Sequence, residues 1–382
     1  MSRVPVPPTM LRWACERAGY DVAHVAKRVP QLWAWVRRER QPTLKQLERL
    51  AKVTHTPLGY LFLPEPPTER LPVPDYRTVS GTAAAKPSPD LLDTLYTMQR
   101  RQAWLRDSLV EHEAEPLAFV GSARLADEPD GAGREMRRIL DLDEGWAAGV
   151  RTWQDAVGEL RRAIEHLGVM AVINGVVGNN THRRLRVEEF RGFALTDPYA
   201  PLIFVNGADA KSAQMFTLAH ELAHVWLGTE GVSGFDTLLP GGTEVEDWCN
   251  RAAAELLAPA QEVRSRWMEV RRLSNPFDSL ARVFKVSPVV AARRALDLTL
   301  IERSTFFDFY EGYVKRERRS GTRATGGDFF NNQNTRVGEL FAAQVVRAAL
   351  EGRIGFKEAY DLTGLRGGTF QKYARRLGMD VP

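Results

Sequence analysis

Residue types that mark secreted proteins, membrane proteins and metal-cluster proteins are scarce in this sequence. Only Cys15 and Cys249 are present, which excludes a disulfide framework and a cysteine-rich metal site. No apolar run approaches the length that spans a bilayer, and the first residues contain no long apolar core of a signal peptide. We therefore expect a cytoplasmic protein without a membrane partner, in which histidine and carboxylate bind any metal ion.

An excess of charge of one sign is also missing. The 52 basic and 48 acidic residues leave a formal net charge of +4, which permits contact with nucleic acid but does not require it. Hydrophobic residues make up 44% and charged residues 26%, which is the composition of an ordinary globular protein rather than a disordered or collagenous one. The length of 382 residues predicts two or three domains.

Residues 1–64 carry the signals of a compact helical domain. A first helical pattern is ended by Gly19, Asp21 is placed to cap a second helix, and Thr43 begins another helix whose leucines lie on one stripe. Residues 65–88 follow as a proline-rich stretch, which predicts an extended linker rather than a helix or strand.

Helices are also predicted on both sides of a mixed region. Residues 89–163 show long amphipathic patterns, interrupted by a polar loop near Ala126–Gly133, and are expected to form a helical connector. The chain becomes helical again past Pro259, where LARVFKVSPVVAARRAL predicts two helices joined by a tight turn. Residues 301–382 are expected to form a C-terminal helical domain.

The mixed region, residues 164–300, combines strands with helices. Three apolar runs bounded by turn residues, GVMAVING, EFRGFAL and PLIFVNG, predict strands. They lead into a helix from about Ala210 to Leu227, in which apolar residues recur at helical spacing. The predicted fold class is therefore α+β, with this region flanked by N-terminal and C-terminal helical domains.

The sequence AHELAH within that helix is typical of a metal-dependent hydrolase. His220 and His224 lie four positions apart, so both imidazoles project from one helix face and can share one ion. Glu221 occupies the position of the general base in the HExxH motif, where it accepts a proton from the attacking water. The predicted core is zincin-like, with a small sheet and the helix that carries HExxH.

A catalytic zinc site of this kind needs a third protein ligand and leaves one further position open. Downstream, TEVEDWCNRAAAELLAP predicts a helix in which Glu246 is the best-placed carboxylate, one turn before Asn250. Spacing alone leaves Glu244, Asp247 and Glu255 open, because acidic residues near a helix N-terminus are also favoured by the helix dipole. Two histidines and one carboxylate predict bound Zn²⁺, with Mn²⁺ as an alternative.

FTLAHELAHVWLG, with the strands before it and VEDWCNRAAAELLAP after it, resembles the ImmA/IrrE family of HExxH metallopeptidases. The resemblance implies that the third ligand is the Glu four residues before the Asn of the second helix, which is Glu246 before Asn250. PTLKQLERLAKVTHTPLGYLFLPEPP and FKVSPVVAARRAL resemble long members that carry an N-terminal XRE-type helix-turn-helix. Such members cleave XRE-type repressors, so the resemblance implies an XRE-type repressor protein as substrate and relief of repression as the outcome.

The N-terminal domain departs from the XRE pattern at its recognition helix. AKRVPQLWAWVRRERQPT leaves little room for that helix, so we expect a shortened helix-turn-helix. Arg37, Arg38 and Arg40 are candidates for contact with DNA phosphates, but they equally fit a solvated rim around a core of Trp33 and Trp35. DNA is therefore expected as a weak or regulatory partner.

Two residues next to Glu246 are candidates for accessory roles. Cys249 follows Glu246 by three positions, and Asn250 follows Glu246 by four, which is about one helical turn. A thiolate at Cys249 that faced the ion would be a redox-sensitive accessory ligand, and simple burial of the thiol is the alternative.

Three functional hypotheses remain at this point. The leading one is a zinc metallo-endopeptidase with Glu221 as general base. The alternative is a DNA-binding transcriptional regulator with a vestigial or structural metal site, and a third is a protein that binds a toxin or repressor without cleaving it. Because His220, Glu221 and His224 are all intact while the helix-turn-helix departs from its pattern, the sequence favours the enzyme.

Overall fold

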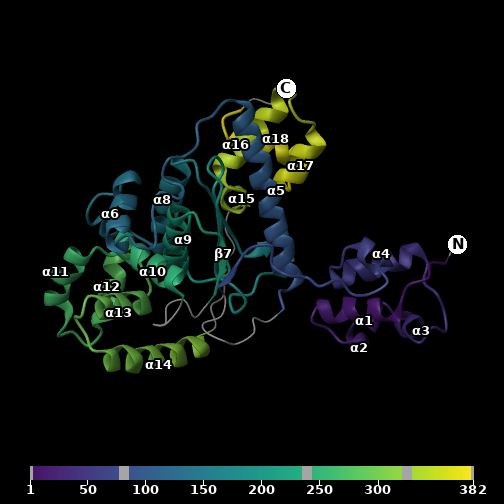
Figure 1. Cartoon of the computed structure of the whole chain (residues 1–382), viewed down its shortest axis with the longest axis horizontal. Coiled ribbons are helices and arrows are strands. Elements are labelled where there is room, and N and C mark those ends of the chain that lie inside the picture. Colours follow the sequence, from purple (N-terminus) through teal and green to yellow (C-terminus); the bar gives the residue numbers. More distant parts are fainter. Residues whose placement is uncertain (1–2, 77–85, 235–242, 321–328, 380–382) are drawn as a thin grey trace. The chain divides into compact units, whose positions relative to one another are not determined.

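The parts of the chain described by the computed structural model (Figure 1) are residues 3–76, 86–234, 243–320 and 329–379. The chain divides into two compact units. The first consists of Met1–Pro72 and Ala85–Tyr96, and the second consists of Val73–Ala84 and Thr97–Pro382. In the described ranges, no helix is both long enough and apolar enough to cross a membrane.

The first unit is a small helical bundle. Its elements are α1 (Pro8–Arg17), α2 (Val22–Ala26), α3 (Leu32–Val36), α4 (Leu44–Thr54), the 3-10 helix η1 (Leu58–Phe62) and the first turns of α5 (Pro89–Glu111). Asp21 accepts a hydrogen bond from the backbone N–H of His24, and Thr43 forms a capping box with Gln46, so both predicted helix starts are present. The stretch before Thr43 forms the five-residue helix α3, because apolar residues at helical spacing are buried there.

The second unit is built around a five-stranded mixed sheet. In spatial order, its strands are β1 (Asp75–Tyr76), β7 (Gly231–Ser233), β5 (Gly192–Leu195), β6 (Leu202–Asn206) and β2 (Met170–Asn174). β5 runs antiparallel to both β6 and β7, whereas β2 is parallel to β6 and β1 is parallel to β7. The three predicted strands are confirmed as β2, β5 and β6, in which every residue is buried.

The edge of the sheet corrects one prediction. Asp75 and Tyr76 lie within the stretch predicted to be a linker, yet they form β1 and pair with Val232 and Ser233 of β7. Strands this short carry no alternating pattern, so neither β1 nor β7 was predicted. A separate hairpin, β3 (Val176–Val177) with β4 (Asn180–Arg184), follows β2.

Helices cover this sheet and bury its apolar side chains. α9 (Lys211–Leu227) packs on β5 and β6, and α8 (Trp153–His166) packs on α9 and β2. α10 (Glu244–Leu257) packs on α9, and α6 (Pro129–Ile139) packs on α10, so these helices share one hydrophobic core. The predicted helices around HELAH and EVEDWCN are confirmed as α9 and α10.

The loop predicted near Ala126–Gly133 is wrong over its second half, where the chain forms the first turns of α6 and packs on α10. The helix already begins at Pro129. A Cβ atom at Gly133 would lie 2.6 Å from the carbonyl oxygen of Ala252 and 2.7 Å from the Cβ atom of Glu255 on α10. The glycine therefore allows close helix packing and does not mark a turn.

A helical layer follows α10. It contains α11 (Ala260–Val270), α12 (Pro276–Phe284), α13 (Pro288–Asp297) and α14 (Arg303–Ser320), with the short α7 (Trp146–Gly149) packed against α12. The predicted tight turn between α12 and α13 is confirmed. Lys285 takes a left-handed conformation with φ of 52°, and the Ser287 hydroxyl accepts a hydrogen bond from the backbone N–H of Val290 at 3.2 Å.

The C-terminal helices also belong to the second unit. They are α15 (Phe329–Val337), α16 (Glu339–Leu350), α17 (Phe356–Thr363) and α18 (Gly367–Arg376). The Glu165 carboxylate on α8 accepts a hydrogen bond from the backbone N–H of Glu339 at 2.8 Å, and Arg101 on α5 donates to the carbonyl oxygen of Leu362 at 2.9 Å. Buried polar contacts of this kind fix α16 and α17 to the rest of the unit.

Candidate metal centre

α9 is buried around its whole circumference, and three of its polar side chains meet at one place. Every residue from Ala213 to Trp226 is buried. His220, Glu221 and His224 are 2%, 0% and 0% exposed, and buried polar groups are costly unless they bind a partner. The helix therefore places ionisable groups in its interior where an ordinary core helix would carry apolar side chains.

Glu246, in the first turn of α10, faces both imidazoles. The Thr243 hydroxyl caps this helix by accepting a hydrogen bond from the backbone N–H of Glu246 at 3.3 Å. The Glu246 Oε2 atom lies 3.2 Å from His220 Nε2, and its Oε1 atom lies 3.2 Å from His224 Nε2. The two Nε2 atoms are 3.2 Å apart. The structure thus brings together the three predicted ligands, whose ligand atoms all lie within 4.8 Å of one another.

This donor set fits a metal ion. An ion with four tetrahedral ligands at about 2.0–2.1 Å separates those ligands by about 3.3–3.4 Å, close to the spacing of the three atoms. In the part of the chain that the structure describes, the oxygens of Glu246 face the two imidazoles and meet no other hydrogen-bond donor. Imidazole and carboxylate lone pairs that converge in a buried space without further donors are the arrangement expected at a cation site.

Neighbouring polar groups orient the two imidazoles. The Nδ1 atom of His224 lies 2.9 Å from the hydroxyl of Thr229, just past the end of α9. If Nδ1 donates its hydrogen to Thr229, the Nε2 lone pair is left for a metal, as in other metal-binding histidines. The Glu246 carboxylate has the main part in raising the pKa of His220, and Asn250, one turn after Glu246, acts in the same direction. The predicted accessory residue Asn250 therefore lies beside the centre.

Glu221 lies between the centre and the sheet. A Cβ atom at Gly192 of β5 would sit 2.8 Å from Glu221 Oε1 and 2.6 Å from Thr217 Cγ2, so the missing side chain makes room for the carboxylate. Burial raises the pKa of Glu221 to about 8, although the charge of His220 opposes this rise. Glu221 is thus a carboxyl group whose protonation responds to positive charge placed beside it.

The charges of the centre are coupled. Burial acts to lower the pKa of His220, but the Glu246 carboxylate raises it above its ordinary value. Burial acts to raise the pKa of Glu246, yet the His220 charge and the hydrogen bonds of both imidazoles hold it at about 2. Burial lowers the pKa of His224. These shifts favour a protonated His220 opposite an ionised Glu246 in the metal-free group, and a cation that binds there competes with the proton.

The other candidate residues of α10 lie elsewhere. Glu244 is exposed, and Asp247 is half-buried near Arg293. Glu255 is paired with Arg294. Cys249 is buried outside the group of close ligand atoms, and burial raises the pKa of its thiol well above the ordinary value. A neutral thiol is a poor metal ligand, which favours the packing role that the sequence left open.

Tyr76 was not predicted to be near the centre. Its ring stacks on the His224 imidazole, with centroids 5.8 Å apart and an interplanar angle of 14°. The contact exists because β1 joins the sheet beside β7. An aromatic residue in a proline-rich stretch was the sole signal available in the sequence, and it does not indicate which helix the ring will meet.

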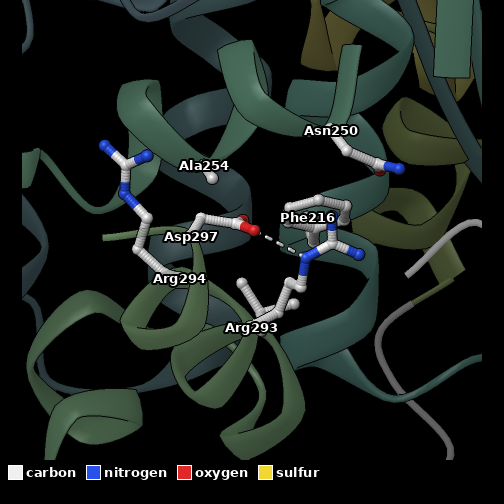
Figure 2. Close-up of a pocket in the computed structure, with 7 residues that line it drawn as sticks. Phe216, Asn250, Ala254, Arg293, Arg294 and Asp297 are labelled. Atoms are coloured by element: carbon white, nitrogen blue, oxygen red, sulfur yellow. Dashed lines mark hydrogen bonds and ion pairs between the residues drawn. The ribbon is translucent and has the colours of Figure 1, made fainter. Parts of the chain in front are cut away.

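A small, shallow pocket lies between α9, α10 and α13 (Figure 2). It is lined by Phe216 of α9, Asn250 and Ala254 of α10, and Val290, Arg293, Arg294 and Asp297 of α13. Arg293 donates a hydrogen bond to Asp297 at 2.9 Å, whereas Figure 2 shows Arg294 turned away from that pair. The centre of the Phe216 ring lies 6.1 Å from that of the His220 ring, so one lining residue is a neighbour of a candidate ligand.

The predicted nucleic-acid contacts belong to the first unit. Arg37, Arg38 and Arg40 follow α3 and are exposed. The Arg37 guanidinium lies 5.6 Å from the centre of the Trp33 ring, which is 38% exposed, whereas Trp35 is buried. The suggested core of two tryptophans is therefore wrong for Trp33, because the short α3 turns it outward.

Comparison with known proteins finds a match to a peptidase family in the middle part of the chain. Residues 165–296 match the peptidase family model described as the IrrE N-terminal-like domain, and residues 337–376 match a domain of unknown function (DUF8813). The search of curated proteins found no match to the chain. The first match contains His220, Glu221, His224 and Glu246. The segment that carries the candidate centre is thus similar to IrrE N-terminal-like peptidases, which supports the ImmA/IrrE family and a metallopeptidase type of function.

Proposed function

We propose that this protein is a zinc-dependent metallo-endopeptidase with His220, His224 and Glu246 as ligands and Glu221 as general base. One observation carries the proposal: three ligand atoms from two helices converge in a buried group, and the buried Glu221 lies next to it. A structural zinc site is closed by four protein ligands, whereas three ligands leave a position open for chemistry. Mn²⁺ is a second candidate for the same donor set.

The chain's own residues supply the proton transfers. When bound, Zn²⁺ would contribute Lewis-acid chemistry at the scissile carbonyl. The Glu221 carboxylate accepts a proton from the attacking water and can return it to the leaving amine. Positive charge lowers the pKa of this carboxyl, as His220 already does, so a cation in the centre favours the ionised form that a base requires. Gly192 keeps space beside the carboxylate open.

The substrate that we propose is an XRE-type transcriptional repressor, whose cleavage would relieve repression. This proposal rests on the resemblance to the ImmA/IrrE family and on the match of residues 165–296. The first unit would be an XRE-like helix-turn-helix with a shortened recognition helix. Its exposed Arg37, Arg38 and Arg40 support weak, salt-dependent contact with DNA phosphates rather than recognition of a base sequence.

A DNA-binding regulator with a vestigial metal site is the competing function, and Glu221 separates the two. We would express wild type and Glu221→Gln together with a candidate XRE-type repressor, and follow repressor fragments by mass spectrometry, with and without single-stranded DNA as a candidate activator. Loss of a general base lowers the rate by about 10²–10⁴-fold, so cleavage should nearly vanish in the variant. Inactivation of the repressor by Glu221→Gln without fragments would show that binding, not proteolysis, is the activity.

A further inference from the structure

Tyr76 is placed against the centre by backbone pairing at the sheet edge. Tyr76 pairs with Ser233, and the backbone N–H of Val232 donates a hydrogen bond to the carbonyl oxygen of Pro74 at 3.0 Å. This ladder sets the position of residues Val73–Tyr76 beside β7, the strand that follows α9 in the chain.

Gly231 provides the space for the Tyr76 ring. A Cβ atom at Gly231 would lie 2.2 Å from Cε2 and 2.3 Å from Cδ2 of Tyr76, closer than any side chain can approach. The ring therefore occupies the volume that another residue at position 231 would fill. Sheet pairing and this small residue together direct the ring toward α9, where it reaches His224.

His224 is held by contacts on two different sides. The Thr229 hydroxyl is 2.9 Å from the Nδ1 atom of His224, while the Tyr76 ring lies nearly parallel to the imidazole at 5.8 Å between centroids. The helix fixes only the backbone of His224, so these contacts restrict rotation of the imidazole. Parallel, offset rings at this separation attract one another. With both contacts in place, Nε2 is directed at Glu246.

We propose that Tyr76 is a positioning residue of the metal centre, whose ring holds the His224 imidazole in the orientation needed to bind the ion. The inference rests on the proposed function, because it assigns His224 as a ligand. It makes Val73–Tyr76 part of the peptidase active site. Loss of an offset aromatic stack of this kind is expected to weaken metal binding by about 2–10-fold.

The test measures metal binding in the full-length protein and needs no substrate. Zn²⁺ affinity would be measured by competition with a chelator, and the absorption spectrum of the Co²⁺-loaded protein would report ligand geometry. We expect Tyr76→Phe to match wild type, because it retains the ring. We expect Tyr76→Ala and Tyr76→Leu to bind Zn²⁺ about 2–10-fold more weakly and to change the Co²⁺ spectrum. Tyr96→Ala, at a tyrosine that is 47% exposed in α5, is the matched control.

The outcomes separate this inference from the proposed function. Wild-type affinity and an unchanged spectrum in a folded Tyr76→Ala or Tyr76→Leu would overturn the positioning role while leaving the metal centre intact. Weak binding by Tyr76→Phe would also overturn it, because the hydroxyl rather than the ring would then be responsible. Should Tyr76→Ala not fold, Tyr76→Leu, which fills more of the same volume, decides. Absence of metal binding by wild type would reject the proposed function itself.

Discussion

The two ends of α10 carry two buried glutamates that differ in how their oxygens are used. Glu246 and Glu255 are each 3% exposed. Glu255 pairs with the Arg294 guanidinium and accepts a hydrogen bond from the backbone N–H of Ala260 at 3.0 Å. The oxygens of Glu246 instead face the imidazole nitrogens of His220 and His224.

The comparison teaches how a structural carboxylate differs from a candidate ligand. Arg294 is 2% exposed and also donates to the carbonyl oxygen of Ala258 at 3.0 Å, so Glu255 and Arg294 satisfy one another in the core. The atoms that Glu246 faces, the Nε2 atoms of His220 and His224, can themselves bind a metal ion. Burial alone therefore does not identify a functional carboxylate, whereas the identity of its partners does.

The largest effect expected from this comparison is on folding stability. Glu255→Ala leaves the buried Arg294 guanidinium with only the Asp130 carboxylate, 3.7 Å away, and arginine cannot deprotonate, so the free energy of unfolding should fall by about 3 kcal/mol. Glu246→Gln in the metal-free protein should destabilise less, because His220 can simply lose its proton. Denaturant unfolding of both variants in the presence of a chelator measures the difference. Equal losses of unfolding free energy in the two variants would contradict the distinction between Glu255 and Glu246.

The next effect concerns pH and metal affinity. In the metal-free protein Glu246 raises the pKa of His220, and burial raises that of Glu221 to about 8. Metal binding must displace the His220 proton and also favours ionised Glu221, so apparent Zn²⁺ affinity should rise with pH between about pH 6 and 8, by up to about tenfold per unit for each proton released.

Glu221→Gln sharpens this pH test. The amide does not titrate, so the variant should release fewer protons and show a shallower rise of affinity with pH. Competition titrations at several pH values compare the two slopes. An affinity that is independent of pH in wild type would contradict the assignment of a protonated His220 in the metal-free centre.

The smallest effects are expected at the other acidic residues of the first turn of α10. Glu244 is exposed, and Asp247 is half-buried near Arg293 and Asp297. Glu244→Ala and Asp247→Ala should retain full metal content, and Glu244→Ala should change stability by no more than about 0.5 kcal/mol. Metal analysis of the purified variants tests this. Loss of the metal in Asp247→Ala would mean that the wrong carboxylate of α10 has been assigned.

The sequence predicted the centre better than its surroundings, for physical reasons. His220, Glu221 and His224 lie on one long helix, so helical spacing alone predicts their proximity. Placing Glu246 opposite them needed the family resemblance, since spacing does not distinguish it from Asp247. Thr229 also lies beside the centre, past the end of α9, but a single hydroxyl in a turn gives no signal of its own.

The parts that could not be predicted depend on pairing between distant segments. β1 and β7 contain two and three residues, too few for an alternating pattern to appear. The role of Tyr76 follows from their register, and the role of Gly192 follows from the position of Glu221 over β5. Gly133 was interpreted as part of a loop and Gly192 as one residue of a predicted strand, whereas both mark places where other atoms pack closely.

The metal content of purified wild type and Glu246→Ala tests the central claim most directly. The account predicts about one zinc or manganese per chain in wild type, because His220, His224 and Glu246 form one site. It predicts loss of most of that metal in a folded Glu246→Ala and full retention in Glu221→Gln. Absence of metal from wild type at neutral pH after zinc is supplied, or full occupancy in Glu246→Ala, would contradict it.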